Sequence, residues 1–197
     1  MPTDDLTATF MTALTTCGGS SAVVSREGLA DAVAALVGGQ GLVLVGPELG
    51  PLCRELLARG VDARPGSSGE PRVAATPSLA PTTAAADFAD AAARAACGVT
   101  GARLGIAASG TVAIDGRSGN AGLLSCLPPH HVAVLQERLI ERDLADALGV
   151  LAGEASTGGA GFVLISGPSR TSDIEMMSVL GVHGPLRLDV LIVREGR

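Results

Sequence analysis

The sequence contains no tryptophan and no tyrosine, and only three phenylalanines among its 197 residues. Proteins that bind single-stranded nucleic acid stack the bases on aromatic side chains, and proteins that bind duplexes need a basic face to neutralise phosphates. This chain has few aromatic side chains and a net charge of −6. We therefore expect no nucleic-acid partner.

The cysteines are few and scattered. They stand at Cys17, Cys53, Cys97 and Cys126, without any C-x-x-C pair. Iron–sulfur clusters and structural zinc sites normally show closely spaced thiolates, so neither is expected, and no metal site or redox cofactor is predicted for the chain. Four buried, reduced thiols are the predicted state, because disulfides are unusual in the cytoplasm.

Two further features are missing. No apolar run has the length of a membrane span, and the first residues lack the basic start and apolar core of a secretory signal. A cytoplasmic protein is therefore predicted. With 47% hydrophobic residues and a mean hydropathy of +0.40, the composition is the opposite of a disordered chain and suffices for one domain over residues 1–197.

The first half alternates strand-like apolar runs with amphipathic helices. Runs at 22–24 and 42–45 predict strands, and apolar residues at helical spacing predict helices after Ser25 and after Pro47. An N-terminal helix over about 4–17 is expected to pack outside the main domain. Residues from about 65 to 82 predict a long surface loop, and residues 84–97 predict a helix. This alternation is typical of a parallel sheet covered on both faces.

The second half has a different character. Short runs at 104–107, 111–114, 123–127 and 132–135 predict strands in close succession, with Asp115-Gly116 as a hairpin signal. We expect them to be antiparallel additions to the parallel sheet. A helix from Leu144 to Leu151 and a final strand over 186–193 complete an α/β pattern.

Most of the chemically capable side chains stand between Phe162 and Pro185. A buried strand at 162–165 precedes a Gly-Pro loop, and Ser172-x-x-Glu175 matches a capping box, which predicts a helix beginning at Ser172. A loop that leads into a helix N-terminus is suited to an anion, and Arg170 can add a bidentate fork. The alternative is that Ser172 only caps the helix and Arg170 is solvated.

Two other segments offer polar groups. Residues 108–111 form a small hydroxyl-bearing loop, which is either an anion-binding concavity or a tight turn. His130 and His131 precede a strand, where neighbours face opposite ways, so they do not bind one metal together and one is expected to face a crevice. His183, with Asp173 and Glu175, supplies the parts for acid–base catalysis.

Three ordered motifs carry a resemblance to a known family. Gly167-Pro-Ser-Arg-Thr-Ser-Asp-Ile-Glu175 followed by Gly181-Val-His-Gly-Pro185, Ile106-Ala-Ala-Ser-Gly-Thr111 and Leu127-Pro-Pro-His-His-Val132 resemble the LUD-domain family, in its lactate utilisation protein C group. The family usually has an acidic residue where Ala108 stands and an Arg near Gly122. The resemblance implies a Rossmann-like α/β fold of the sugar-phosphate isomerase and CoA-transferase type.

The resemblance also implies a function and a site. The expected role is in a system that oxidises L-lactate to pyruvate with iron–sulfur partner proteins, where this chain binds a small anionic carboxylate or phosphate. The residues assigned to catalysis are Asp173, His183 and His131. Those assigned to the ligand are Ser109, Gly110, Thr111, Gly167, Ser169, Arg170, Thr171 and Glu175.

Two other hypotheses remain open. The chain can be a stand-alone isomerase or acyl-CoA transferase that uses Asp173, His183 or Glu48 on an anionic substrate, or a module that only binds partner proteins. Glu48 enters by analogy with a CoA-transferase-like fold. Because ligands of open parallel sheets sit beyond the carboxyl ends of the strands, we expect the loops after Val45, Ala107 and Ile165 to open toward one crevice.

Overall fold

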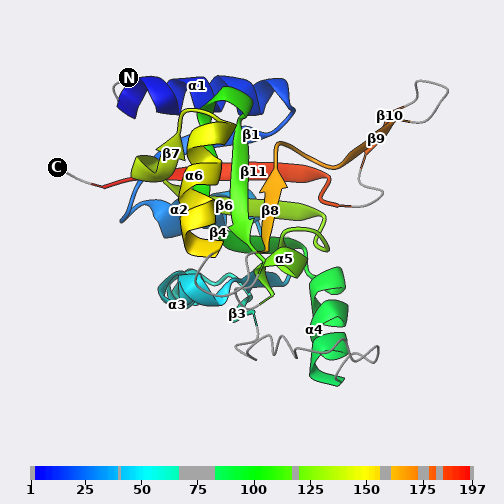
Figure 1. The fold of residues 1–197 in the computed structure, drawn as a ribbon. Helices are drawn as coiled ribbons and strands as arrows, with labels where there is room; N and C mark the ends of the chain where they lie inside the picture. Colours follow the sequence, from blue (N-terminus) through cyan, green and yellow to red (C-terminus); the bar gives the residue numbers. More distant parts are fainter. Residues whose placement is uncertain are drawn as a thin grey trace.

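A sheet of six parallel strands forms the centre of the protein (Figure 1). The computed structural model describes residues 3–39, 41–66, 83–116, 120–155, 161–172, 178–180 and 184–195. The strand order is β1-β11-β6-β4-β2-β3, and each neighbouring pair is parallel. The strands are β1 (Ser20–Ser25), β2 (Val43–Val45), β3 (Ala63–Pro65), β4 (Cys97–Ile106), β6 (His130–Gln136) and β11 (Arg187–Arg194). Strands buried on both faces explain the continuous apolar runs of the sequence.

The long strand β4 belongs to two sheets. Its first part pairs with β2 and β6, whereas its second part pairs antiparallel with β5 (Thr111–Asp115) and parallel with β7 (Ile140–Glu141). β8 (Phe162–Ile165) then pairs antiparallel with β5. The predicted mixed α/β fold with added antiparallel strands is therefore confirmed. The expectation that the run at 132–135 is an antiparallel addition is wrong. This run lies in β6, which is inside the parallel sheet between β4 and β11.

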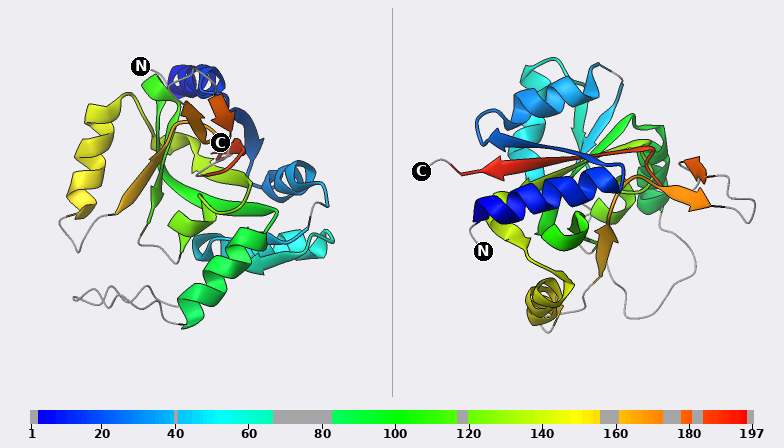
Figure 2. Two further views of the ribbon diagram at one scale, coloured as in Figure 1. Left: turned by 90° about the vertical axis from the view of Figure 1, so that its right-hand side faces the viewer. Right: turned by 90° about the horizontal axis from the view of Figure 1, so that it is seen from above.

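Helices cover both faces of the parallel sheet. α2 (Leu29–Val37) and α3 (Gly50–Ala58) pack against Val132 and Val134 of β6. α1 (Thr3–Thr16) packs on the opposite face, against Ala133 and Leu135 of the same strand (Figure 2). The expectation that the N-terminal helix lies outside the main domain is wrong, because Phe10 and Leu14 of α1 are completely buried.

Two smaller apolar clusters complete the core. α4 (Thr83–Arg94) and α5 (Ala121–Leu124) enclose Phe88 and Leu124 against Leu44 of β2. α6 (Leu144–Ala155) covers Leu104 and Ile106 in the second part of β4 through Ala147. No helix among the described residues has the length and apolar character needed to cross a membrane.

Several predicted elements are wrong for local reasons. The run at 123–127 is not a strand, because the amides of Leu124 and Ser125 bond back to Asn120 and Ala121 to form α5. The helix predicted over 84–97 ends at Arg94, and Cys97 begins β4. Asp115-Gly116 follows β5 and is not a hairpin turn, because the next element is the helix α5. The hairpin of this region joins β4 to β5, and its turn lies at 107–110.

The helix predicted to begin at Ser172 does not begin there, and residues 173–177 lie outside the described residues. Arg170–Ser172 forms β9, which pairs antiparallel with β10 (Ser178–Leu180). A capping-box pattern describes only the local chain, and here pairing between two strands takes its place. The described part of the predicted 65–82 loop is limited to Pro65 and Gly66, and the rest lies outside the described residues.

Candidate functional site

The sequence-predicted loops do not share one crevice. The loop at 107–110, which follows β4, and the loop that follows β8 both reach the C-terminal end of α1. This end of α1 leads into the start of β1. Ser109 O accepts from Cys17 Sγ at 3.9 Å, and the backbone of Gly167 lies against Cys17 O. The loop after Val45 instead lies where the parallel strands end, since Gly46 N–H donates to Val99 O. We call these two places the amino edge and the carboxyl edge of the sheet.

Three hydroxyl groups meet at the amino edge. Thr111 Oγ1 lies 2.6 Å from Ser109 Oγ and 2.8 Å from Ser166 Oγ. Thr111 is buried, whereas Ser109 and Ser166 are exposed. The structure therefore brings together side chains from two segments that are about fifty positions apart in the sequence, and two of the three residues are exposed. We call Ser109, Thr111 and Ser166 the hydroxyl cluster.

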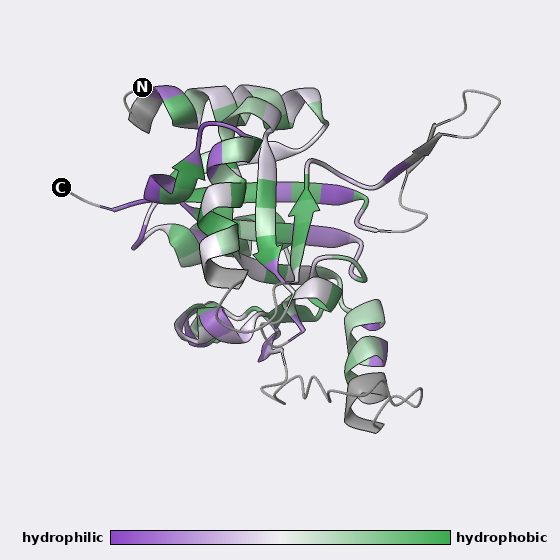
Figure 3. Cartoon of the chain, in the orientation of Figure 1, coloured by the Kyte–Doolittle hydropathy of each residue, from purple (hydrophilic) through white to green (hydrophobic). Residues whose placement is uncertain are grey.

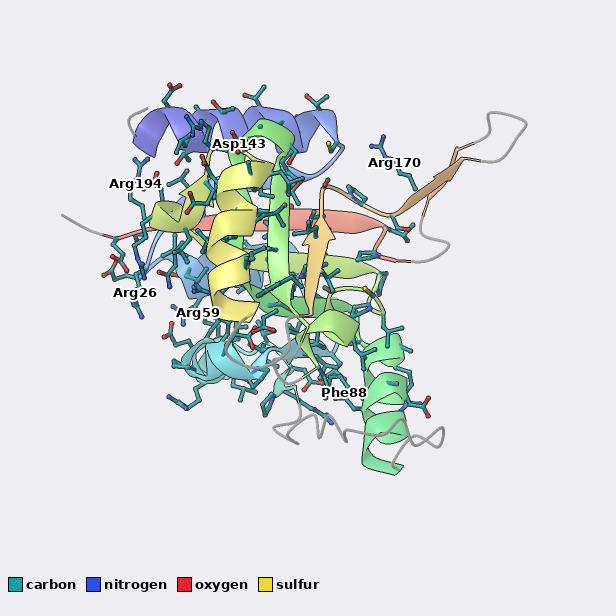
Figure 4. All side chains as sticks on the ribbon, viewed as in Figure 1. Arg26, Arg59, Phe88, Asp143, Arg170 and Arg194 are labelled. Carbon is teal, nitrogen blue, oxygen red and sulfur yellow. The ribbon has the colours of Figure 1, made fainter. Side chains whose placement is uncertain are left out.

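Arg170 comes from the same end of the molecule (Figure 4). Its guanidinium lies directly over Gly18, where a side chain would collide with it. Cations are stabilised near the C-terminus of a helix, and α1 ends two residues before Gly18. Arg170 is exposed, and no carboxylate in the described part of the chain forms an ion pair with it. Its guanidinium can thus present N–H donors to an anion.

Residues 107–111 form a tight turn rather than an amide concavity. Ala108 N–H already donates to Arg142 O, and Gly110 N–H to Ala107 O. Gly110 is buried with a φ of 61°, and a Cβ there would lie 2.5 Å from Leu14 Cα. The glycine is needed because α1 packs directly on the turn. Of the two readings of this loop, the tight turn is the one that its hydrogen bonds favour.

The remaining predicted residues are distributed unevenly. Ser169 is fixed near the start of β11, because its N–H donates to Pro185 O at 2.8 Å, and Thr171 lies on β9. Asp173, Glu175 and His183 lie outside the described residues. Their assigned roles therefore stay predictions.

A buried ionic cluster lies where β1, β6 and β11 begin. Asp189 is 3% exposed, and its carboxylate contacts His130 Nε2 at 2.6 Å, Arg187 Nε at 2.6 Å and the Ser20 hydroxyl. Burial raises the pKa of Asp189, but hydrogen bonds from His130, Ser20 and Arg187 outweigh it and hold the pKa below its usual value. Figure 3 shows the hydrophilic starts of β6 and β11 beside their apolar interiors. The cluster ties three strands together.

His131 points away from that cluster and into the core. It is completely buried, Nε2 lies 2.8 Å from Thr100 Oγ1, and Nδ1 has no partner in the described part of the chain. Burial, with repulsion from His130, lowers the pKa of His131 to about 3. The expectation that one of the two histidines faces a crevice is wrong, because His130 and His131 are both buried, and the assignment of His131 to catalysis stays a prediction.

This buried imidazole predicts a dependence of stability on pH. The folded protein keeps His131 neutral down to about pH 3, whereas the unfolded chain protonates it near its ordinary value of 6.5. Between these values the unfolded state binds more protons, so the free energy of unfolding falls as the pH falls, by up to about 1.4 kcal/mol per pH unit. Urea unfolding between pH 6.5 and 4.5 measures the slope. The same slope in His131→Gln would rule this out.

The carboxyl edge carries a second set of polar groups. Glu48 follows β2 and accepts a hydrogen bond from Gly101 N–H at 2.8 Å. Two hollows of about 170 and 320 Å³ flank it, and both are also lined by Gln136. Sequence reasoning reached Glu48 only by analogy and missed Gln136. A polar residue that ends the apolar run of β6 was the available signal.

Cysteine positions differ in part from expectation. Cys53 and Cys97 are buried, but Cys17 is half-buried and Cys126 is exposed. Burial raises the pKa of the Cys97 thiol to about 12. In the described part of the chain, no three His, Cys, Asp or Glu side chains are grouped to hold a metal ion.

Six parallel strands with helices on both faces, extended by a small antiparallel sheet, define a Rossmann-like α/β protein. Within that class, the model of the LUD domain matches residues 8–193, so this chain belongs to the LUD domain family. The crystal structure of a DUF162 family protein from Deinococcus radiodurans has the same fold, with a TM-score of 0.72 at 22% identity and coverage of 98% of this chain and 99% of that one.

Curated relatives match over shorter stretches. "Lactate utilization protein C" of Deinococcus radiodurans is 35% identical over 96 residues, which cover 48% of this chain and 45% of that protein. The protein of the same name from an Exiguobacterium species is 34% identical over 107 residues, covering 52% and 46%. The matched stretches thus span less than half the length of these relatives.

Proposed function

We propose that this chain is a component of a lactate utilisation system and binds a small carboxylate at the amino edge. The observation that carries the proposal is the similarity to proteins named lactate utilization protein C, at 35% and 34% identity. Membership of the LUD domain family, matched over residues 8–193, supports it across the whole fold.

The chemistry of the amino edge fits such a ligand. A guanidinium binds a carboxylate through two parallel N–H bonds, and Arg170 has no carboxylate partner in the described part of the chain. Lactate also carries a hydroxyl group, which can exchange hydrogen bonds with Ser109 and Ser166. Arg170 and the hydroxyl cluster both lie by the C-terminal end of α1. The charged group and the hydroxyls of Ser109 and Thr111 therefore come from two of the three sequence motifs that carry the family resemblance.

The proposal assigns electron transfer to partner proteins. Oxidation of lactate to pyruvate releases two electrons and two protons, which an acceptor must take up. The four cysteines of this chain are scattered along the sequence without a C-x-x-C pair. Iron–sulfur proteins are the partner class that would accept the electrons. The purified chain alone is then expected not to oxidise lactate.

Ligand-dependent thermal stability tests the site. L-lactate, pyruvate, sugar phosphates and acyl-CoA are titrated against the wild type, Arg170→Ala and Arg54→Ala, which removes an exposed arginine of α3. A ligand at a hundred times its Kd adds about 2.7 kcal/mol, or about 5 to 10 °C in Tm for a chain of this length. We expect lactate or pyruvate to raise the Tm of the wild type and of Arg54→Ala, but not that of Arg170→Ala.

Two results would contradict the proposal. One is the absence of any shift with lactate and pyruvate. The other is an equal shift in Arg170→Ala, which would leave Arg170 with only a structural role at the end of α1. A shift caused by sugar phosphates or acyl-CoA alone would support the alternative of a stand-alone enzyme.

A further inference from the structure

The carboxyl edge of the parallel sheet contains an open crevice far from Arg170. Figure 4 shows Arg26 and Arg194 at one end of the molecule and Arg170 at the other. The crevice consists of the two hollows of about 170 and 320 Å³, which share Glu48, Leu49, Val134 and Gln136. It lies where β4 pairs with β2 on one side and β6 on the other. In open α/β sheets this edge is where small ligands bind.

Glu48 is held in place by two glycines. Its Oε1 accepts from Gly101 N–H, and side chains at Gly46 and Gly101 would come within 2.8 and 3.0 Å of Glu48 Cδ and Cγ. The absence of both side chains lets the carboxylate lie across the ends of β2 and β4. Glu48 is exposed at this position and lines both hollows. Its carboxylate is therefore presented in a defined orientation between them.

Gln136 provides the second observation. It is the last residue of β6, it lines both hollows, and its Oε1 is buried without a hydrogen-bond partner in the described part of the chain. Buried polar atoms in native proteins are nearly always paired, so an unpaired acceptor indicates a missing donor. A donor supplied by a ligand in the adjoining hollow would satisfy it.

Acceptors predominate in the crevice. Besides Glu48 and Gln136, the hollows are lined by three carboxylates, from Glu55, Asp115 and Glu195, and by two guanidinium groups, from Arg26 and Arg103. Leu29, Leu52 and Val193 form an apolar wall in the smaller hollow. Glu195 also forms an ion pair with Arg138, which lies outside the lining. The other three carboxylates and the amide oxygen against two guanidinium groups still disfavour a phosphate or a carboxylate and favour hydrogen-bond donors.

We infer that the crevice is a second binding site, distinct from the carboxylate site of the amino edge, for a small neutral or cationic molecule rich in donors. Hydroxyl or ammonium groups of this ligand donate to Glu48 and to Gln136 Oε1. The ligand's carbon skeleton lies against the apolar wall. This inference does not depend on the proposed role in lactate utilisation.

Titration calorimetry with two probes tests it: D-ribose as a neutral polyol and 1,4-diaminobutane as a diamine. The variants are Glu48→Gln and Gln136→Leu, and Asp90→Asn on α4 is the matched acid-to-amide control. We expect at least one probe to bind the wild type, Asp90→Asn and Arg170→Ala with equal affinity. Both crevice variants should weaken it by about tenfold or more, since each removes a hydrogen bond to the ligand and leaves a ligand donor unpaired.

The free Gln136→Leu protein supplies a separate readout. Replacing an unpaired buried acceptor by an apolar group of similar size does not destabilise a fold. Its Tm is therefore expected to equal or exceed that of the wild type while binding is lost. Failure of both probes to bind, unchanged binding in the two crevice variants, or loss of binding in Arg170→Ala would each overturn the inference. None of these results bears on lactate binding, which Arg170→Ala tests by itself.

Discussion

Replacement of Gly110 by alanine is expected to destabilise the protein by about 3 kcal/mol or more, because two costs of about 1–3 kcal/mol each add together. The first is backbone strain, since Gly110 has a φ of 61°. The second is steric, because the new Cβ would lie 2.5 Å from Leu14 Cα and 2.7 Å from the Ala13 carbonyl carbon. These atoms belong to the backbone of α1, so no side-chain rotation relieves the contact.

Gly60→Ala separates the two costs. Gly60 has a φ of 78°, but no atom lies within 4 Å of a Cβ built there. Its substitution therefore carries the strain without the collision and should cost about 1 kcal/mol. Urea unfolding of both variants gives the comparison. Equal losses in Gly110→Ala and Gly60→Ala would show that α1 is not packed on the 107–110 turn as described.

Asp189→Ala is the second substitution with a large expected effect, about 3–5 kcal/mol, because it leaves the buried His130 without the carboxylate that it contacts. His130 is 5% exposed, and it would lose the carboxylate that accepts from its ring at 2.6 Å. Arg187 and Ser20 would lose the same acceptor. Since these residues belong to β1, β6 and β11, the damage falls on the pairing of three strands. The free energy of unfolding from chemical denaturation measures it.

An exposed pair of the same residue types is the control. Asp62 and Arg64 are also two positions apart and form an ion pair of 3.4 Å, but both are more than half exposed. Asp62→Ala should therefore change stability by about 0–1 kcal/mol. Comparable losses in Asp189→Ala and Asp62→Ala would mean that burial of the cluster contributes nothing.

The same cluster gives a distinct acid dependence. The hydrogen bonds to Asp189 lower its folded-state pKa below the ordinary 3.8, so its contribution to stability is complete above that value. The contribution disappears as the pH falls through the lowered folded pKa. The loss of stability caused by protonation of Asp189 is therefore expected below the pH range in which His131 dominates the pH dependence of the free energy of unfolding.

The two edges of the sheet also explain why the family motifs did not predict the crevice. The motifs contain Ser109, Thr111 and Arg170, which gather at the amino edge, whereas Glu48 and Gln136 lie at the carboxyl edge outside all three motifs. A shared motif shows which residues a family has in common, but it does not show at which edge of the sheet they lie. For Ser109, Thr111 and Arg170 the edge is decided by the pairing of β8 with β5.

Local patterns in the sequence were sufficient for the α/β class and for elements whose apolar period is clear. α2, α3 and α6 follow from helical spacing, and β2, β5 and β11 from short apolar runs between turn residues. The segments 109–111 and 166–170 could each be predicted to carry polar groups in a loop, because each follows a predicted strand. These inferences need only neighbouring residues, and the forces behind them act over one or two turns of chain.

Only the tertiary structure decided what depends on distant partners. The burial of α1 rests on Phe10 and Leu14 filling space beside β6 and β11, and Ser172 pairs with Ser178 in β10 where the local sequence favours the start of a helix. A final strand over 186–193 is predicted from its local pattern, yet only His130 and Ser20 from two other strands place Asp189 in a buried cluster. Strand order and register depend on contacts between segments that are distant in the sequence, such as Ser20 with Asp189 across β1 and β11, and no local pattern records them.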